Sequence, residues 1–209
     1  ITVSRQAVED GGWVERHTDV TELRRAEKQL SYLAGHDALT ELPNRRHFRA
    51  KIDEALLPVD GTKQFAVMFL DLDKFKAVND NIGHAAGDEL LKQVAKRLSD
   101  CVTADDCVCR LGGDEFAVLQ FSGQQPEAAS ELAERLAQAI LRPFVIHGRD
   151  VHIGVSIGIA ISGQDGGTAS VLLQNADMAV YQAKEDGSSS YRFFTSELSD
   201  LQRMRHRLE

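Results

Sequence analysis

The sequence contains little cysteine, proline and tryptophan. Among its 209 residues are 3 cysteines, 4 prolines and 1 tryptophan. Cys101, Cys107 and Cys109 lie close together, but so few thiols, in an odd number, are typical of a reducing compartment and argue against a disulfide framework. A zinc site would need a fourth ligand at a suitable spacing, and none is evident. We therefore expect these cysteines to be small, buried apolar side chains.

Long hydrophobic runs are also missing. No segment approaches the roughly 20 apolar residues of a membrane-spanning helix, and the start of the chain does not resemble a signal peptide. The chain opens at Ile1 without a methionine, which indicates a piece of a longer protein. We expect a cytoplasmic domain that makes no membrane contact itself, in a parent protein that other segments can attach to a membrane.

Positive charge is in deficit, with 24 Lys and Arg residues against 32 Asp and Glu residues and a net charge of −8. A nucleic-acid-binding surface needs a basic patch, so this balance argues against a nucleic-acid partner and against a polymerase. It permits a small anionic ligand, which needs only a local pocket of cations or backbone amides.

The two ends of the chain differ from its middle. Residues 1–18 alternate weakly in polarity and are expected to be the last strands of a truncated domain, since two strands alone bury too little surface to be stable. Residues 19–35 predict a linker helix with apolar residues at heptad-like spacing, namely Leu23, Ala26, Leu30 and Leu33. A two-stranded coiled coil and a single amphipathic helix both fit this spacing. Residues 196–209 predict a helix that leaves the domain.

The middle of the chain predicts a split β-α-β fold. The continuous apolar run 65–70 is typical of a buried central strand. Hydrophobic periodicity and capping residues predict helices over 44–56, 87–98, 127–141 and 168–186. Two hairpins are predicted, one pairing 107–111 with 116–121 and one pairing 144–146 with 151–161, followed by a short strand at 191–194. This order predicts an α+β, ferredoxin-like (βαββαβ) fold with a mostly antiparallel central sheet flanked by helices.

Acidic residues fall where this fold would bring them together. Asp71 and Asp73 follow the buried strand, and Asp114 and Glu115 lie at the tip of the first hairpin. The first strand of this topology lies between or beside the hairpin strands, so we expect these acids to be near one another. Such a cluster of carboxylate oxygens suits Mg²⁺, which would also offset their mutual repulsion. The alternative is that turns and strand ends are simply acidic.

A glycine pair precedes the hairpin acids. Gly112 and Gly113 suit the positive φ of a tight turn, and without side chains they also let a nucleotide approach the backbone. Residues 110–116 read Arg-Leu-Gly-Gly-Asp-Glu-Phe, which resembles the signature of the GGDEF family of diguanylate cyclases. Four further segments resemble family motifs in the same order: 37–46, 71–88, 156–160 and 176–184.

The resemblance covers residues 36–195 and implies a GGDEF domain with the family's palm-type fold. It implies that the domain condenses two GTP into cyclic di-GMP with release of two pyrophosphates, in a homodimer with two Mg²⁺ (or Mn²⁺) ions per active site. The flanking segments resemble parts of other domains. Residues 12–22 resemble the end of a PAS sensor domain, and residues 191–209 resemble the segment that precedes an EAL phosphodiesterase domain.

The resemblance further implies roles for individual residues. Asp71, the Leu72 carbonyl, Asp114 and Glu115 would hold the metals, and Asp114 would assist removal of the 3′-hydroxyl proton, with Glu115 as the second catalytic acid. Arg110 would pair with a carboxylate and order the hairpin. The residues that would bind GTP are Phe75, Lys76, Asn79, His84, Asp88, Gly112, Gly113 and Lys184, of which Asn79 and Asp88 would read guanine.

Two positions depart from the family pattern. The family has an arginine that helps to bind phosphate where this chain has Ser188, which predicts weaker GTP binding by about 1–2 kcal/mol. Many members have an inhibitory product site, Arg-x-x-Asp, where this chain has Thr103 and Asp106. The hydroxyl of Thr103 cannot replace a guanidinium that binds phosphate, so no product inhibition is expected at this site.

Two functions from different classes remain open at this point. The intact acids and glycines favour an active cyclase. Ser188 and the phosphodiesterase-like tail favour a catalytically weak or inactive GTP-binding module that regulates an attached EAL phosphodiesterase domain.

Overall fold

The computed structural model describes residues 2–7, 13–22, 25–26, 32, 34–57, 64–187 and 189–197. The chain divides into two compact units, residues 1–36 and residues 37–209. The predicted linker helix at 19–35 is described only in part, and the predicted exit helix at 196–209 lies outside the described residues apart from its first two.

The first unit contains a two-stranded antiparallel sheet. Strand β1 (Thr2–Ala7) pairs with β2 (Trp13–Thr18), and Arg5 forms an ion pair with Glu15 across it at 3.0 Å. Trp13 is 70% exposed, so this hairpin leaves its largest apolar side chain uncovered. The assignment of residues 1–18 to a truncated sensor domain remains a prediction.

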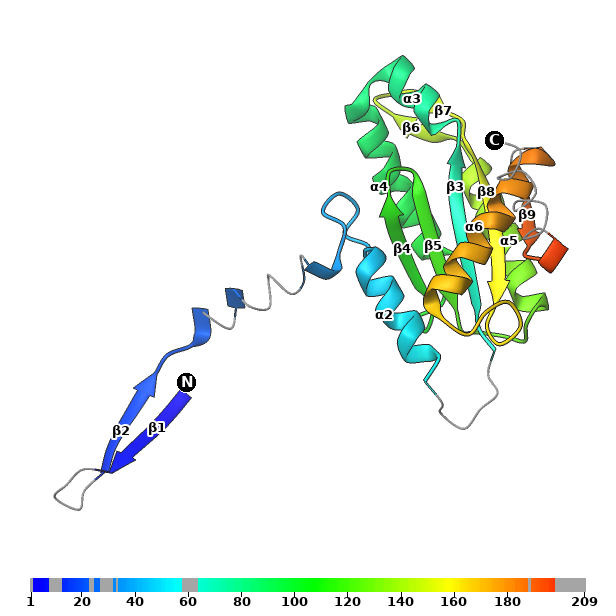
Figure 1. Cartoon of the computed structure of the whole chain (residues 1–209). Coiled ribbons are helices and arrows are strands. Elements are labelled where there is room, and N and C mark those ends of the chain that lie inside the picture. The colour runs from blue at the N-terminus through cyan, green and yellow to red at the C-terminus, as the bar shows by residue number, and fades with distance from the viewer. Residues whose placement is uncertain are drawn as a thin grey trace, which may run out of the picture. The chain divides into compact units, whose positions relative to one another are not determined.

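The second unit is built on a five-stranded sheet with the order β4-β5-β3-β8-β9 (Figure 1). Its strands are β3 (Ala66–Asp73), β4 (Cys107–Gly112), β5 (Glu115–Gln120), β8 (Gly154–Ile161) and β9 (Tyr191–Phe193). Its helices are α2 (Arg45–Ala55), α3 (Phe75–Ile82), α4 (His84–Asp100), α5 (Glu127–Leu141) and α6 (Ala169–Glu185). All neighbouring strands are antiparallel except β8 and β9, which are parallel.

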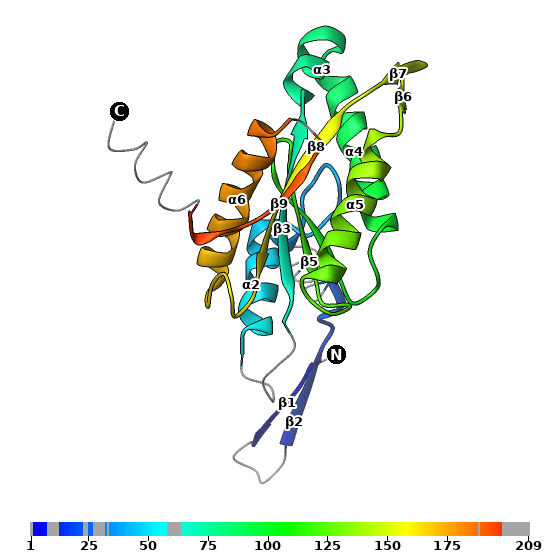
Figure 2. The same cartoon turned by 90° about the vertical axis from the view of Figure 1, so that its right-hand side faces the viewer.

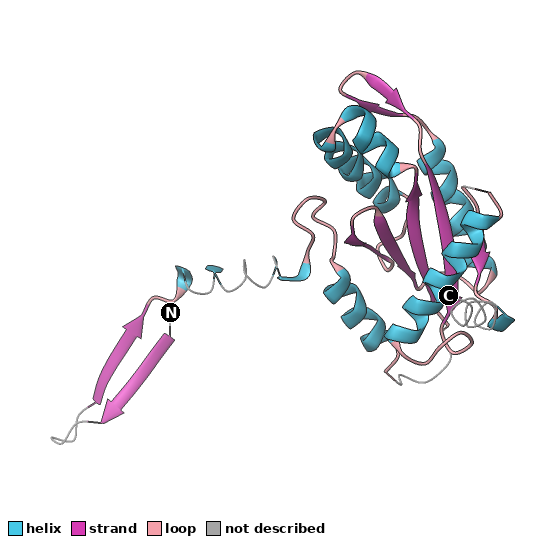
Figure 3. Ribbon diagram, turned by 45° about the horizontal axis from the view of Figure 1, so that its top comes forward, coloured by secondary structure: helices cyan, strands magenta, loops and turns pink. Residues whose placement is uncertain are grey.

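This arrangement confirms the predicted α+β fold with its mostly antiparallel sheet. The first strand of the motif, β3, lies beside only one strand of the hairpin, β5, and its other neighbour is β8. The sheet separates two layers of helices, with α2 and α6 on one face and α4 and α5 on the other (Figures 2 and 3).

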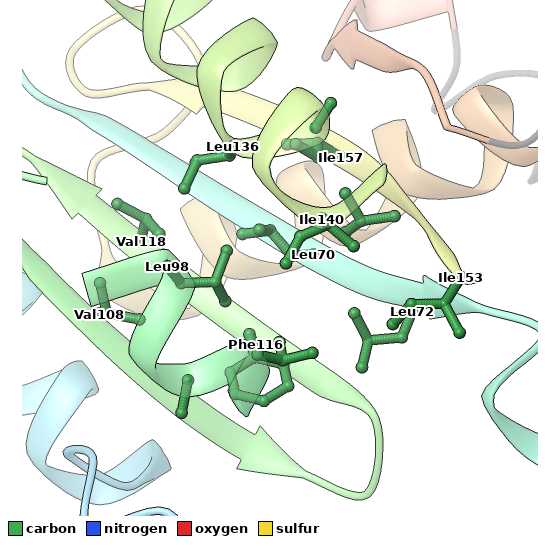
Figure 4. Close-up of a cluster of buried hydrophobic side chains, with 14 of the residues drawn as sticks. Leu70, Leu72, Leu98, Val108, Phe116, Val118, Leu136, Ile140, Ile153 and Ile157 are labelled. Atoms are coloured by element: carbon green, nitrogen blue, oxygen red, sulfur yellow. The ribbon is translucent and has the colours of Figure 1, made fainter. Parts of the chain in front are cut away.

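Both faces of β3 are buried, because each layer of helices covers one of them. Met68, Leu70 and Leu72 pack toward α4 and α5, in a cluster that also contains Leu98 and Leu136 (Figure 4). Val67 and Phe69, the alternate residues of the strand, face the other way. They belong to a second cluster with side chains from α2 and α6, namely Phe48, Ile52, Leu172, Ala176 and Val180. A strand buried on both faces explains the continuous apolar run in the sequence.

The predicted starts of two helices are confirmed by their caps. The Asn44 side chain accepts a hydrogen bond from His47 N at the start of α2, and Thr168 accepts one from Val171 N at the start of α6. Helix α6 lies very close to β8, because a Cβ on Gly158 would collide with Ala176 O and Val180 N. Glycine at this position therefore sets the distance between α6 and the sheet.

The structure differs from the prediction in three places. Residues 75–82 form helix α3, which the sequence analysis did not predict, and α4 begins at His84 rather than at Gly87. The pairing of 144–146 with a single strand 151–161 is wrong. Strand β6 (Phe144–Ile146) pairs with a separate short strand, β7 (Arg149–Val151), and the central strand β8 starts only at Gly154.

The cysteine prediction is confirmed for Cys107 and Cys109, which are buried free thiols, whereas Cys101 is half-buried. Burial raises the pKa of all three thiols above the ordinary value, which favours their protonated form. Among the described residues, no helix is long and apolar enough to cross a bilayer.

Candidate active site

The exit of β3 meets the tip of the β4–β5 hairpin. Asp71 is paired in register with Glu115 across the sheet, and Leu72 N donates a hydrogen bond to Asp114 O at 3.3 Å. The three acids predicted for the metal site, Asp71, Asp114 and Glu115, are thus on adjacent ends of two strands. Asp114 lies in the turn itself and Glu115 begins β5, so the hairpin fixes the positions of both.

The turn itself depends on glycine. Gly112 has φ +141° and Gly113 has φ +53°, and no atom lies within 4 Å of where a Cβ would be on either residue. Backbone conformation therefore requires these glycines, and the space beside them is open. Arg110 Nη2 donates to Gly113 O at 2.8 Å, while Arg110 Nη1 forms an ion pair with Asp37 at 2.8 Å. This confirms the prediction that Arg110 pairs with a carboxylate and orders the hairpin.

Two cations lie against the acids. Lys184 Nζ, in the last turn of α6, is 2.6 Å from Asp71 Oδ1. Arg45 Nη2, at the start of α2, is 3.2 Å from Glu115 Oε2, and Arg45 Nε is within 3.4 Å of Leu111 O. Both helices lie on the same face of the sheet (Figure 2).

These cations do not fully offset the negative charge. Burial and the neighbouring Asp71 raise the pKa of Asp114, against the opposing effects of Lys184 and Arg110. Burial also raises the pKa of Glu115; Arg45 lowers it, and Asp177, Asp71 and Asp114 raise it. The site thus holds several carboxylates that disfavour one another's ionised form.

The acids fit a divalent cation in their chemistry. Carboxylate oxygens are the donors that Mg²⁺ and Mn²⁺ prefer, and the mutual repulsion just described would be relieved by a cation between them. Within the residues that the structure describes, no three Asp, Glu, His or Cys side chains already form a metal cage. Instead, the Lys184 ammonium occupies one oxygen of Asp71, so the carboxylate would have to share its oxygens with a metal.

Asp73 is not part of this acidic group, although the sequence analysis placed it there together with Asp71. Its side chain is buried, at 7% exposure. Oδ1 accepts a hydrogen bond from Ser156 Oγ at 2.8 Å, and Oδ2 accepts one from Ser189 N at 2.9 Å. Both oxygens are therefore engaged by protein donors.

The residues predicted to read guanine lie on α3 and α4, directly after β3. His84 and Asp88 are exposed on successive turns of α4, and Asn79 is half-buried on α3. A Cβ on Gly87 would collide with Asn79 Oδ1, so this glycine lets the amide approach α4. The structure therefore brings Asn79 close to the turn that carries Asp88.

Phe75 and Lys76 begin α3. The side chain of Phe75 is buried in the core and that of Lys76 is exposed. The preceding residue, Lys74, has φ +64° and provides no side-chain cap. The first amides of α3 therefore have no capping side chain, as at helix N-termini that hold phosphate.

The Thr103–Asp106 turn is held together by hydrogen bonds to the Asp106 carboxylate. Asp106 Oδ2 accepts hydrogen bonds from Thr103 N at 3.0 Å and Thr103 Oγ1 at 2.8 Å, and Oδ1 accepts one from Phe121 N at 2.9 Å. Burial would raise the pKa of Asp106, but these hydrogen bonds outweigh it and hold the pKa below its ordinary value. This carboxylate already binds its own chain.

The sequence analysis gave no role to two residues of the site, Arg45 and Asp177. Asp177 precedes Lys184 by seven residues, two helical turns, so both lie on one face of α6. Burial and Asp71 raise the pKa of Asp177, while Arg45 and Lys184 lower it. The i, i+7 spacing from Lys184 was the signal in the sequence. Ser188, by contrast, lies outside the described residues.

Comparison with known proteins identifies the fold and its hairpin. The family described as "Diguanylate cyclase, GGDEF domain" matches residues 34–190, which include the acids at both strand ends. The chain belongs to the GGDEF family.

Its relatives include proteins of different activities. It is 45% identical over 189 residues to the bifunctional diguanylate cyclase/cyclic di-GMP phosphodiesterase MucR of Pseudomonas aeruginosa, covering 89% of this chain and 27% of MucR. It is 40% identical to the cyclic di-GMP phosphodiesterase PdeR of Escherichia coli, covering 87% of this chain and 27% of PdeR. The chain thus spans about a quarter of these curated relatives.

A solved GGDEF domain has the same fold. The structure of the GGDEF domain of YfiN (TpbB) from Pseudomonas aeruginosa matches with a TM-score of 0.77 at 37% identity, covering 80% of this chain and 99% of that domain. The α+β architecture with its central sheet is therefore the architecture of a GGDEF domain.

Proposed function

We propose that this GGDEF domain is a diguanylate cyclase, which condenses two GTP into cyclic di-GMP and two pyrophosphates. The observation that supports this most is the acidic group of Asp71, Asp114 and Glu115 beside the open glycine turn, with Lys184 at its edge. Carboxylates that can hold a metal ion, a glycine turn without side chains and a lysine ammonium together suit the binding of a nucleoside triphosphate.

The reaction forms two equivalent phosphodiester bonds. The 3′-hydroxyl oxygen of each GTP attacks the α-phosphorus of the other, the bond from that phosphorus to the bridging oxygen breaks, and pyrophosphate leaves. Asp114 accepts the hydroxyl proton. Two Mg²⁺ (or Mn²⁺) ions, held by Asp71, Leu72 O, Asp114 and Glu115, would supply Lewis-acid stabilisation of charge on the phosphates.

Other residues orient the nucleotide. Asp88 accepts hydrogen bonds from the ring N–H and exocyclic amine of guanine, and Asn79 both donates and accepts on the same edge, with His84 lining the pocket. Lys76 and Lys184 bind the triphosphate, together with the uncapped amides of α3 at Phe75. Gly112 and Gly113 leave room for the phosphates.

The proposal extends to the partner domain and to the segments that flank the GGDEF domain in the sequence. Each domain binds one GTP, so two domains face each other in a homodimer, which the predicted helix at 19–35 would help to form. Residues 1–18 end a PAS-like sensor domain, and 196–209 lead to an EAL-like domain, in a cytoplasmic part of the parent protein. Asp106 is engaged by Thr103 and Phe121, which supports the absence of an inhibitory product site.

A second function is a catalytically weak or inactive GTP-binding module that regulates an attached EAL phosphodiesterase domain. Two observations favour it. Ser188 stands where the family has a phosphate-binding arginine, and one relative, PdeR, is named a phosphodiesterase.

Incubation of the chain with GTP and Mg²⁺, followed by chromatography of the nucleotides, separates the two functions. We expect a cyclic di-GMP peak that disappears in Asp114→Ala, because this variant removes both a metal ligand and the proton acceptor. Asp105→Ala, which removes an exposed acid away from the site, is the matched control and should keep the peak. GTP binding without product, also after enforced dimerisation, would support the regulatory module instead.

A further inference from the structure

Asp73 joins three segments of the chain that are far apart in sequence. It ends β3, Ser156 lies in β8, and Ser189 follows α6. The carboxylate accepts hydrogen bonds from the Ser156 hydroxyl and from the Ser189 backbone amide, one on each oxygen. Hydrogen bonds to a buried carboxylate are among the stronger ones in a protein.

The close approach of these groups depends on a glycine. A Cβ on Gly154 would collide with Ser189 Oγ and would lie 2.7 Å from Asp73 Oδ2. Gly154 is paired with Asp73 across the sheet. The bare backbone at residue 154 thus makes room for the loop that Asp73 binds.

The same loop is also held at Ser190. Ser190 Oγ donates to Ala183 O at 2.8 Å, and Ile157 N donates to Ser190 O at 2.9 Å. One turn before the loop, Lys184 contacts Asp71. Asp71 and Asp73 are two residues apart on one strand, so they share a face. One carboxylate therefore holds the last turn of α6, and the other holds the loop after it.

We propose that Asp73 is a positioning residue for GTP binding: it anchors the loop after α6 and thereby fixes Lys184 beside Asp71, where the triphosphate binds. This inference rests on the proposed binding of GTP at Asp71 and Lys184. It matters in this chain because Ser188, the residue before Ser189 in the sequence, cannot replace a phosphate-binding arginine. More of the phosphate binding then depends on Lys184.

The rival role is that of a metal ligand, and the two roles predict different effects of an amide. An asparagine at position 73 can accept from Ser189 N through its oxygen and donate to Ser156 Oγ through its nitrogen, because a hydroxyl accepts as well as donates. It therefore preserves the anchor. It is a far poorer metal ligand than a carboxylate, so a metal role would be lost.

The experiment compares wild type, Asp73→Ala and Asp73→Asn in the full chain by two measurements. Hydrogen exchange of the Ser189 amide, followed by NMR without nucleotide, reports the anchor itself. Titration with GTP carrying sulfur on the α-phosphate, at several Mg²⁺ concentrations, reports binding. Asp165→Ala is the matched control, because Asp165 also anchors a backbone amide, Ile161 N at 2.7 Å, at the opposite end of β8.

We expect Asp73→Ala to speed Ser189 exchange and to weaken nucleotide binding, each about tenfold, while Asp73→Asn and Asp165→Ala stay within about twofold of wild type. Unchanged Ser189 exchange in Asp73→Ala would overturn the proposal. So would an Asp73→Asn variant that binds as weakly as Asp73→Ala and recovers at high Mg²⁺, which is the behaviour of a metal ligand. A wild-type chain that binds no nucleotide would instead overturn the proposed function, and the exchange data would still decide whether Asp73 holds the loop.

Discussion

Asp114 is a residue at which the proposed function and stability conflict. It stands beside Asp71 at the hairpin tip, and burial together with that neighbour raises its pKa. A carboxyl with a raised pKa in the folded protein is penalised in its ionised form, so at neutral pH it lowers stability. As the pH falls through the folded-state pKa, the group takes up its proton and the penalty disappears.

This conflict predicts that Asp114→Asn stabilises the chain while abolishing synthesis. Without divalent cations at pH 7, the melting temperature should rise by roughly 1–3 °C, a small gain because the partly exposed charge is screened by solvent. Thermal melts in EDTA measure it, and the gain should shrink as the pH is lowered through the folded-state pKa of Asp114. Asp105→Asn, which changes an exposed acid away from the site, is the control. A lower melting temperature for Asp114→Asn would contradict the argument.

The roles of single residues were only partly readable in the sequence. Asp71 and Asp73 look alike there, because both are acids on the same face of one strand. What distinguishes them is Ser156 and Ser189, which approach Asp73 only after the chain has folded. Arg45 was missed for the same reason, since its partner Glu115 is 70 residues away.

At the scale of elements, local patterns predicted the sheet and the long helices but not where the chain changes direction. Residues 151–161 read as one apolar strand, yet the chain leaves the small β6–β7 hairpin and enters the central sheet only at Gly154. Helix α3 was missed because it has only eight residues and follows β3 directly, through Lys74 at positive φ. Tertiary packing determines both features, and the pattern of apolar residues in the sequence does not reveal that packing.

The turn before β4 is held to the end of β5 by one carboxylate, which makes its stability depend on pH. Asp106 accepts from Thr103 and from Phe121, and its folded-state pKa lies below the ordinary value. Stability from such a group is present above its unfolded-state pKa, which is near 3.8, and is lost as the pH falls through the folded-state pKa.

We therefore expect Asp106→Asn to lower the free energy of unfolding at pH 7 by about 1 kcal/mol, allowing for solvent screening of a partly exposed group. An amide cannot accept on both sides, so one hydrogen bond is lost. Urea unfolding at pH 7 and at pH 3 measures the effect, which should shrink at the lower pH. Asp105→Asn changes the neighbouring exposed acid and should have no effect. An equal loss at both pH values would show that ionisation of Asp106 does not contribute.

At the scale of the whole molecule, the proposed chemistry needs more than one chain. In the proposed mechanism, the acids, the glycine turn and Lys184 would make one GTP site per domain, whereas the product joins two nucleotides through two equivalent bonds. The residues that would bring two domains together, 19–35, precede the GGDEF domain and show only a heptad-like spacing. Since the chain spans about a quarter of its curated relatives, dimerisation in the parent protein can draw on other segments.

This requirement predicts that synthesis depends on protein concentration. If two domains must meet, the rate per molecule of the chain should rise in proportion to its concentration while most of it is monomeric. Fusion of a dimeric coiled coil before residue 19 should remove that dependence and raise the rate at low concentration by about 100-fold or more, since linked domains meet at an effective concentration near millimolar. Initial rates of pyrophosphate release over a concentration series measure this, with the fused Asp114→Ala chain as the control. A rate per molecule that is independent of concentration in the unfused chain, while sedimentation shows a monomer, would contradict the dimeric mechanism.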